Sequence, residues 1–485
     1  MPPEGKKTPP SCQNQGVKRL RFGGKYLKLV GRWPAARAIL CHRMKRKPLH
    51  PHHAARIHAR NIAPRRTDAA HPRPEGAVYL GGFRAPALET VRIGLVGLGE
   101  RSSVHLEQLN AIPHAEVVGL CDLRLDALHS AAEGCEGSSL QLFCGEEGYE
   151  RMLTELRPDA VIISTSWETH AAMAVTAMEH GAHALVEVPL GTTLEELWRV
   201  VDAAERTQRH CMMLENCCYG REELMFLHMV RRGLPGELLH AEAAYIHDLK
   251  HQIQDEAAWR AAHFISRNGN LYPTHGLGPV AQYMNIARGE DMFARLVSFS
   301  SPAVGRAAYA EENLDNDHPL NGADFHCGDI NTTLIKTRKG RTIMVQWDET
   351  SPRPYSRKNL IQGSLGTLAG FPTRVAGCGF NDGSEWHLDA DALYAEYEHP
   401  LRKRLGAVAE QTDSRRDGMN YIMLARIIEC LHRGEPLDQN VYEGALWSAV
   451  SPLSEKSVHE GGSPQPFPDF TRGGWKHTAP LGIVE

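Results

Sequence analysis

The four residues Tyr272-Pro-Thr-His275 bring together side chains that can move a proton. Pro273 suits the first position of a helix, which would make Tyr272 the cap and put His275 in the first turn. The positive end of the helix dipole favours a neutral imidazole there, and a neutral imidazole can accept a proton. The motif makes His275 a candidate base, although a capped turn with a structurally satisfied histidine would have the same sequence.

A second stretch that could do chemistry is the glycine turn Gly97-Leu-Gly99, which follows a run of apolar and small residues from Val91. Glycine at 97 would allow a tight turn, and glycine at 99 would let the backbone approach phosphates at the start of a helix. Ser102 stands in place of the third glycine of the fingerprint, with Arg101 before it. Such a turn by itself is only a weak indication of a dinucleotide-binding site.

The next strand strengthens the signal for a dinucleotide site. Ala115–Cys121 ends in Asp122, close to the distance of ~20 residues at which a carboxylate takes the adenosine ribose hydroxyls. We therefore predict a strand-turn-helix unit with bound NAD. A glycine-containing turn that binds nothing is the alternative.

Strands and helices alternate as far as Leu214, which predicts right-handed βαβ units and a mostly parallel sheet. Ligands of such sheets lie beyond the carboxyl ends of the strands. The residues expected at that edge, besides Asp122, are Ser164 to His170, Glu187 and Asn216 to Tyr219.

The pattern changes in the second half of the chain. Gly236–His247 predicts a strand of a second sheet with Tyr245 near its end, and Asp329–Thr337 and Thr342–Asp348 predict an antiparallel pair. An antiparallel sheet with one solvated face suits a substrate wall. The predicted fold class is α/β, with a Rossmann dinucleotide-binding domain and a second α/β domain that has an open, largely antiparallel sheet.

We expect three parts along the chain: residues 1–85 as a basic extension, 90–216 as the NAD-binding domain, and 217–485 as a substrate and oligomerisation domain with a C-terminal tail. The extension lacks apolar periodicity, which favours a disordered segment or an upstream-extended reading frame. A nucleic-acid or membrane arm is the less favoured interpretation, so a nucleic-acid partner is not expected.

Composition sets further limits. The 485 residues carry a net charge of −4, and no run approaches the ~18 apolar residues of a membrane span. Eleven scattered cysteines without a CxxC motif are typical of reduced thiols, so we expect a cytoplasmic protein, with export left open. Phe325–Asp329 gathers ligand types, but strand alternation would separate His326 from Cys327, so no metal is expected.

Several motifs, in one order over residues 90–480, resemble the Gfo/Idh/MocA oxidoreductases and, among them, glycoside hydrolase family 109, the NAD-dependent α-N-acetylgalactosaminidases. The superfamily has a Glu-Lys-Pro motif with a catalytic lysine, and the Glu187-Val188-Pro189 of this chain resembles the family 109 variant. The other matching segments are Asn216–Tyr219, Gly236–Tyr245, Trp259-Arg260, Gly269–Gly276, Trp447–Ser457 and Phe467–Trp475.

The resemblance implies hydrolysis of a glycan or small molecule that ends in α-N-acetylgalactosamine. The implied route is oxidation at C3, elimination, water addition and reduction, with no net redox change. We expect His275 and Tyr219 to transfer protons, with Tyr272 assisting. The expected substrate contacts are Tyr245, Arg260, Tyr272, Pro273, Thr274, His275 and Tyr355. The expected NAD contacts are Gly97, Gly99, Arg101, Ser102, Asp122, Trp167, Glu168, Thr169, His170, Glu187, Val188 and Asn216.

Two other functions fit parts of the sequence. An NAD(P)-dependent sugar dehydrogenase would have the same fold, but Val188 cannot replace the buried lysine that usually accepts the proton. A silent NAD-binding or nucleic-acid-binding protein would not need Tyr219, Arg260 and His275. Related folds often pair through the open sheet, so a homo-oligomer is a further expectation.

Overall fold

The computed structural model describes residues 71–135, 140–254, 258–413 and 417–482. The predicted basic extension therefore lies outside the described residues as far as residue 70. The described residues form two β-sheets with helices packed against them, and the expected α/β fold class is confirmed.

The first sheet has six parallel strands in the order β3-β2-β1-β4-β5-β6, which is the order of a doubly wound dinucleotide-binding fold. Its central strands β4 and β5 are fully buried runs, as expected for strands covered on both faces. The strands are β1 (Val91–Val96), β2 (Ala115–Asp122), β3 (Gln141–Cys144), β4 (Ala160–Ile163), β5 (His183–Val186) and β6 (Cys211–Met213). The intervening helices are α2 (Glu100–Leu109), α3 (Leu125–Glu133), α4 (Gly148–Leu156), α5 (Trp167–Glu179) and α6 (Leu194–Thr207).

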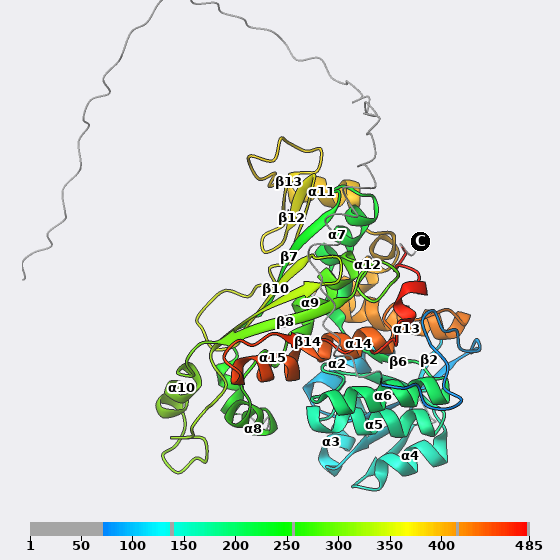
Figure 1. The fold of residues 1–485 in the computed structure, drawn as a ribbon. Coiled ribbons are helices and arrows are strands. Elements are labelled where there is room, and N and C mark those ends of the chain that lie inside the picture. The colour runs from blue at the N-terminus through cyan, green and yellow to red at the C-terminus, as the bar shows by residue number, and fades with distance from the viewer. Residues whose placement is uncertain (1–70, 136–139, 255–257, 414–416, 483–485) are drawn as a thin grey trace, which may run out of the picture. The chain divides into compact units, whose positions relative to one another are not determined.

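The second sheet has eight strands in the order β13-β12-β11-β7-β10-β9-β8-β14 (Figure 1). All neighbouring pairs are antiparallel except β7 and β10, so the expectation of a largely antiparallel sheet is confirmed. The strands are β7 (Leu238–Ile246), β8 (Phe293–Ser300), β9 (Ile330–Thr337), β10 (Thr342–Asp348), β11 (Leu360–Gly363), β12 (Gly366–Ala369), β13 (Arg374–Gly377) and β14 (Gln465–Pro466).

Helices from the second half of the chain pack against both sheets; α13, for example, contacts β1 and α2 of the first sheet's domain. They are α7 (Arg221–Arg231), α8 (Ala258–Ser266), α9 (Thr274–Tyr283), α10 (Gly305–Asn313), α11 (Ala390–Tyr397), α12 (Pro400–Thr412), α13 (Met419–Arg433), α14 (Val441–Ser448) and α15 (Val450–His459). The short 3-10 helices are η1 (Asn216–Tyr219), η2 (Lys250–Gln254) and η4 (Gly474–His477).

Residues 71–85, which we expected to belong to the disordered extension, are instead packed on the folded chain. Leu80 is buried, and its backbone N–H donates to the hydroxyl of Tyr442 at 2.9 Å. Arg73 and Arg472 both bind the buried carboxylate of Glu205, at 2.9 and 2.8 Å. The expected boundary at residue 85 is therefore wrong, because these residues bind groups far along the chain that the local pattern does not reveal.

Helix α9 approaches strand β7 closely, because its first turn contains Gly276. A Cβ atom at residue 276 would lie 2.4 Å from the backbone nitrogen of Ala244. The helix begins at Thr274 with Pro273 as its N-cap, one residue later than the sequence suggested. His275 still lies in the first turn.

Within the described ranges, no helix is both long and apolar enough to cross a membrane.

We expect Gly276→Ala to lower the free energy of unfolding by about 1–3 kcal/mol, since the new methyl group would overlap backbone that cannot move aside cheaply. Denaturant unfolding followed by circular dichroism measures this. Gly134→Ala is the matched control, because a Cβ there meets only the Ala131 carbonyl oxygen at 3.6 Å. Equal stability of the two variants would contradict the close packing.

Candidate functional site

The glycine turn after β1 has the conformation and the space that a dinucleotide needs. Gly97 has φ of +83°, and a Cβ atom there would lie 2.8 Å from the Ser164 carbonyl carbon. Gly99 caps α2 with extended backbone and has open space where a Cβ would be. The first N–H groups of α2 are thus accessible to phosphates.

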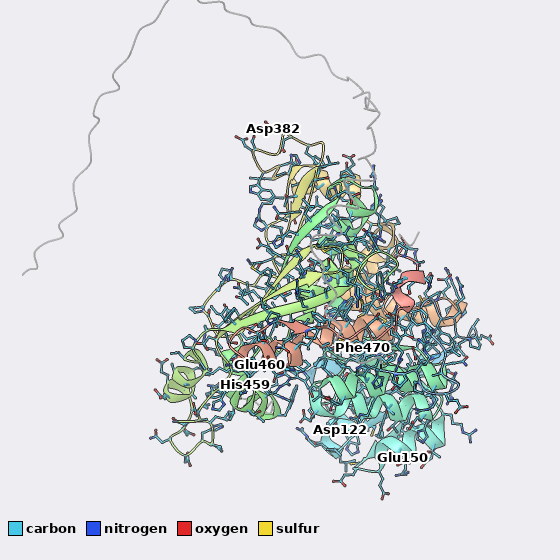
Figure 2. The ribbon with its side chains drawn as sticks, viewed as in Figure 1. Asp122, Glu150, Asp382, His459, Glu460 and Phe470 are labelled. Carbon is cyan, nitrogen blue, oxygen red and sulfur yellow. The ribbon has the colours of Figure 1, made fainter. Side chains whose placement is uncertain are left out.

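Asp122 and Ser102 shape this turn. Asp122 lies at the end of β2 (Figure 2). Its carboxylate accepts the Leu98 N–H at 2.7 Å and the Arg124 N–H at 2.9 Å. The Ser102 hydroxyl donates to the Gly99 carbonyl at 2.8 Å, so it closes the first turn of α2. Asp122 thus ends β2 and Ser102 lies in the first turn of α2, and their contact with NAD stays a prediction.

Glu187 is the centre of a buried ionic network at the same sheet edge. Its Oε1 accepts bonds from Arg101 at 2.6 Å and from His105 at 2.7 Å, and Arg101 also donates to Asn420 at 3.0 Å. Burial alone would raise the pKa of Glu187, but the charge of Arg101 and the His105 bond hold it well below its usual range. Asn420 in turn accepts the amide of Asn216 at 2.7 Å.

Arg101 is expected to contact the cofactor, and in the structure its Nε donates to Glu187 and its Nη2 to Asn420. Its Nη1 is buried and makes no hydrogen bond among the described residues. A buried unpaired donor is costly, and a bound hydroxyl or phosphate oxygen would satisfy it. The residues at this edge therefore fit a dinucleotide.

The polar side chains that follow β4 and β5 mostly bond to other groups of the protein. Both ring nitrogens of His170 face backbone carbonyls, of Pro189 at 2.7 Å and Thr165 at 3.0 Å. Glu168 binds His263 at 3.3 Å, and the Thr169 hydroxyl bonds that of Thr165 at 2.7 Å.

Val188 is 3% exposed and belongs to the core. An apolar side chain enclosed in this way cannot accept a proton, so the position after Glu187 takes no part in acid–base chemistry.

Aromatic side chains from several elements surround His275, and we call Trp167, Tyr245, Tyr272 and Tyr355 the aromatic wall. The ring centroids of Tyr272 and Tyr245 lie 4.9 and 5.0 Å from that of His275. Trp167 stacks on Tyr272 at 5.7 Å, and Tyr355 lies edge-on to Tyr245 at 6.1 Å. The sequence predicted each of these residues at the site, and the structure brings them together.

Arg260, on α8, lies over this wall. Its guanidinium carbon is 5.2 Å from the Trp167 ring centroid and 5.9 Å from that of Tyr272. Stacking on aromatic faces orients the planar group and leaves its N–H edges for a ligand. Pro273 is the N-cap of α9, and Thr274, the first residue of that helix, is buried.

His275 is hydrogen-bonded through Nδ1 to the buried carboxylate of Glu215 at 2.7 Å. We had expected the helix dipole to keep this histidine neutral, and the structure corrects that expectation. Burial acts to lower the pKa of His275, but the neighbouring Cys217 and Glu215 outweigh it and place the pKa well above its usual value. A favourable charge in contact is stronger than a helix terminus.

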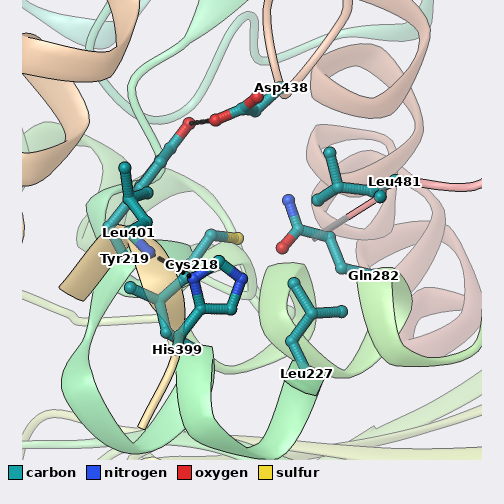
Figure 3. Close-up of a pocket in the computed structure, with 10 residues that line it drawn as sticks. Cys218, Tyr219, Leu227, Gln282, His399, Leu401, Asp438 and Leu481 are labelled. Carbon is teal, nitrogen blue, oxygen red and sulfur yellow. Dashed lines mark hydrogen bonds between the residues drawn. The ribbon is translucent and has the colours of Figure 1, made fainter. Parts of the chain in front are cut away.

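Tyr219, which we paired with His275 from the sequence, faces a different part of the molecule. Its hydroxyl donates to Asp438 Oδ2 at 3.3 Å, and both residues line a pocket with Gln282 and Leu481 (Figure 3). Burial raises the pKa of Tyr219 well above its usual value, and the adjacent Asp438 adds to the rise. No residue of the aromatic wall lines that pocket.

Glu215, Cys217 and His275 also offer three metal-ligating atom types within 4.8 Å of one another. Two ligands of one tetrahedral zinc ion, each about 2.0–2.1 Å from it, would lie about 3.3 Å apart. The 2.7 Å between Glu215 and His275 is instead a hydrogen-bond distance. The geometry is that of an acid–base cluster, and the absence of a metal stays a prediction.

Three residues of the site, Glu215, His105 and Asn420, are not predicted from the sequence. Glu215 follows β6 directly, so the strand-end rule that selected Asn216 would have found it one residue earlier. His105 and Asn420 lie within helices and carry no local signal.

We expect Asp122→Ala to weaken NAD binding about tenfold or more, the effect of losing a hydrogen bond to a charged group of about 1.5–3 kcal/mol. Discrimination against NADP should fall as well, because the carboxylate that repels a 2′-phosphate is gone. Dinucleotide titrations followed by fluorescence measure both effects. Asp126→Ala is the control, since the Asp126 side chain is 73% exposed on the next helix; equal losses in both variants would contradict the assignment.

Solved structures that match this fold include dehydrogenases crystallised with NADH. Levoglucosan dehydrogenase in complex with NADH and levoglucosan matches with a TM-score of 0.61 at 18% identity, over 78% of this chain and 100% of the other. The WlbA dehydrogenase from Bordetella pertussis in complex with NADH and UDP-GlcNAcA matches with a TM-score of 0.54 at 16% identity, over 79% and 99%. At these identities the likeness concerns the fold.

Sequence relatives are more specific. Residues 91–215 match the oxidoreductase family with an NAD-binding Rossmann fold, and residues 219–477 match the C-terminal domain of glycosyl hydrolase 109. A glycosyl hydrolase family 109 protein of Akkermansia muciniphila is 57% identical over 85% of this chain and 89% of its own length. One from Shewanella amazonensis is 51% identical over 86% and 93%. The chain therefore belongs to glycosyl hydrolase family 109 and carries an NAD-binding Rossmann domain.

Proposed function

We propose that this protein hydrolyses α-N-acetylgalactosaminides with a resident NAD, by oxidation, elimination, water addition and reduction without net redox change. The observation that carries the proposal is the position of His275, which is bonded to Glu215 and enclosed by the aromatic wall. At the edge of the first sheet where NAD would bind, the buried Val188 stands where a dehydrogenase has a proton acceptor. The groups that transfer protons must therefore come from the second domain.

The cofactor, when bound, takes a hydride from the sugar and later returns it. The glycine turn and Asp122 would hold the dinucleotide, while Arg101 Nη1 would satisfy one of its oxygens. Arg260 and the aromatic wall offer a cationic and an apolar surface to a sugar ring and its acetamido group. Positioning of the sugar against the cofactor is the main task of these residues.

Two groups are proposed to transfer protons, His275 and Tyr272. Tyr272, and not Tyr219 as expected from the sequence, is proposed as the proton-transfer partner of His275, because the centroids of the two rings are 4.9 Å apart. Burial raises the pKa of Tyr272, and the charges of His275 and Arg260 oppose that rise. A tyrosine needs such neighbours to exchange a proton near neutral pH.

One experiment distinguishes this reaction from the alternative, an NAD(P)-dependent sugar dehydrogenase. The purified protein is incubated with an aryl α-N-acetylgalactosaminide in deuterated water without added NAD. Aglycone release, deuterium at C2 and no accumulation of NADH support elimination. NADH accumulation on addition of NAD, with the glycoside intact, would support the dehydrogenase instead.

We expect His275→Ala to lose about 10²-fold or more of the hydrolytic rate, the usual contribution of a positioned acid–base group. Bound NAD should be retained, because His275 lies on α9 and not at the glycine turn. Aglycone release and the dinucleotide content of the purified variant are measured together. Unchanged turnover would remove His275 from the mechanism. His180→Ala is the control, because that histidine is exposed and its Nδ1 contacts the Thr176 carbonyl, at 2.9 Å, at the end of α5.

A further inference from the structure

We propose that Glu215 is a positioning residue that orients His275 and makes its imidazole the proton donor of the site. The inference rests on the proposed glycosidase function for its chemical step, and on the structure alone for the state of the histidine. It changes the role of His275 from the base expected from the sequence to an acid.

The Glu215 carboxylate is held rigidly from several sides. The residue is fully buried, and its Oε1 accepts the His275 Nδ1–H at 2.7 Å and the Cys217 N–H at 3.1 Å. The backbone carbonyl of Glu215 accepts the Gln439 side-chain amide at 3.2 Å. Since Nδ1 is engaged, Nε2 on the opposite side of the ring is the nitrogen that can face a substrate.

The charge balance favours an imidazolium. Glu215 Oε2 is buried and makes no hydrogen bond within the described part of the chain, so His275 is the cation that compensates the carboxylate. A buried carboxylate without a cation would be strongly unfavourable. Burial works against the charged form of Glu215, yet its pKa lies below the usual value because of His275.

The other groups that face His275 do not reverse this balance. Cys217 packs against it from η1 and also raises its pKa. Tyr245 approaches from β7, Tyr272 from the segment before α9, and Tyr355 from the connection after β10. The pKa of each tyrosine is raised by burial, so all three are neutral hydroxyls near neutral pH.

The step assigned to His275 is protonation of the leaving group. As the sugar C1–O bond breaks, its electron pair stays on the glycosidic oxygen, which takes the proton from Nε2. The C2–H bond breaks in the same elimination: its electron pair forms the C1=C2 double bond, and its proton leaves to solvent water. The neutral imidazole stays hydrogen-bonded to Glu215. When water later adds, its oxygen bonds C1, a solvent proton bonds C2, and one proton of the adding water returns to Nε2, so the histidine ends in its starting state.

The experiment compares the wild type with Glu215→Gln, which keeps the shape and an acceptor oxygen but removes the charge, and with Glu215→Asp, which keeps the charge. Histidine-labelled full-length protein is titrated by NMR, and the His275 signal is assigned with His275→Gln. Aryl α-N-acetylgalactosaminide hydrolysis is measured over the same pH range. Retained NAD and unchanged circular dichroism verify that each variant is folded.

We expect wild-type His275 to lose its proton at a higher pH than an ordinary histidine, and to lose it at least about one pH unit lower in Glu215→Gln than in the wild type. Because activity needs the protonated form, hydrolysis falls as pH rises through the His275 pKa, and this alkaline limb should move to lower pH in Glu215→Gln. The kcat should fall about 10²-fold with little change in KM, and Glu215→Asp should recover part of the loss.

The outcomes separate the inference from the function on which it rests. An unchanged His275 titration in Glu215→Gln, or an unchanged alkaline limb, would overturn the role of Glu215. Absence of hydrolysis by the wild type would refute the proposed function, while the NMR titration would still decide whether Glu215 controls the histidine. Cys217 is the other group that raises the pKa of His275, and Cys217→Ser tests its contribution. If the His275 pKa fell further in Cys217→Ser than in Glu215→Gln, the thiol and not Glu215 would set the ionisation of the histidine.

Discussion

The packing of α9 against β7 of the second sheet and against η1, which follows β6, is the constraint on which the site depends. Gly276 lets the helix meet the backbone of Ala244, and a Cβ at Gly278 would lie 3.0 Å from the Glu215 Cγ. Larger residues at these two positions would push the helix away from the end of β6. Only at this separation can His275, which comes from the second domain, reach a carboxylate of the first.

Two buried carboxylates at neighbouring strand ends have their negative charges balanced by different cations. One pair has a structural role, and the other can take part in a reaction. Glu187 is paired with Arg101, whose guanidinium does not lose its proton, so that ion pair fixes the cofactor edge permanently. Glu215 is paired with His275, which can exchange its proton. Desolvation makes both pairs necessary, but only the second can take part in a reaction.

The same fold supports dehydrogenases among the solved structures, and the site explains how it can support a hydrolase. The position that follows Glu187 is a buried valine, so proton exchange at the cofactor edge is lost. The proposed acid–base groups lie instead on α9 and beside it, where Arg260 and the aromatic wall can bind a sugar. A fold sets where a cofactor lies, and the side chains around it determine the reaction.

The sequence by itself determined the parallel sheet, the glycine turn and Asp122, because these depend on local apolar runs and on backbone conformations that glycine alone adopts readily. The strand-end rule indicated Trp167 of the aromatic wall, and the family resemblance indicated Tyr245, Tyr272 and Tyr355. Only the tertiary structure decided the ionisation of His275 and the direction of Tyr219, since both depend on partners 60 and 219 residues away along the chain. Helix-terminus reasoning gave the opposite charge for His275, because a contacting carboxylate outweighs a dipole and no local pattern reveals that carboxylate.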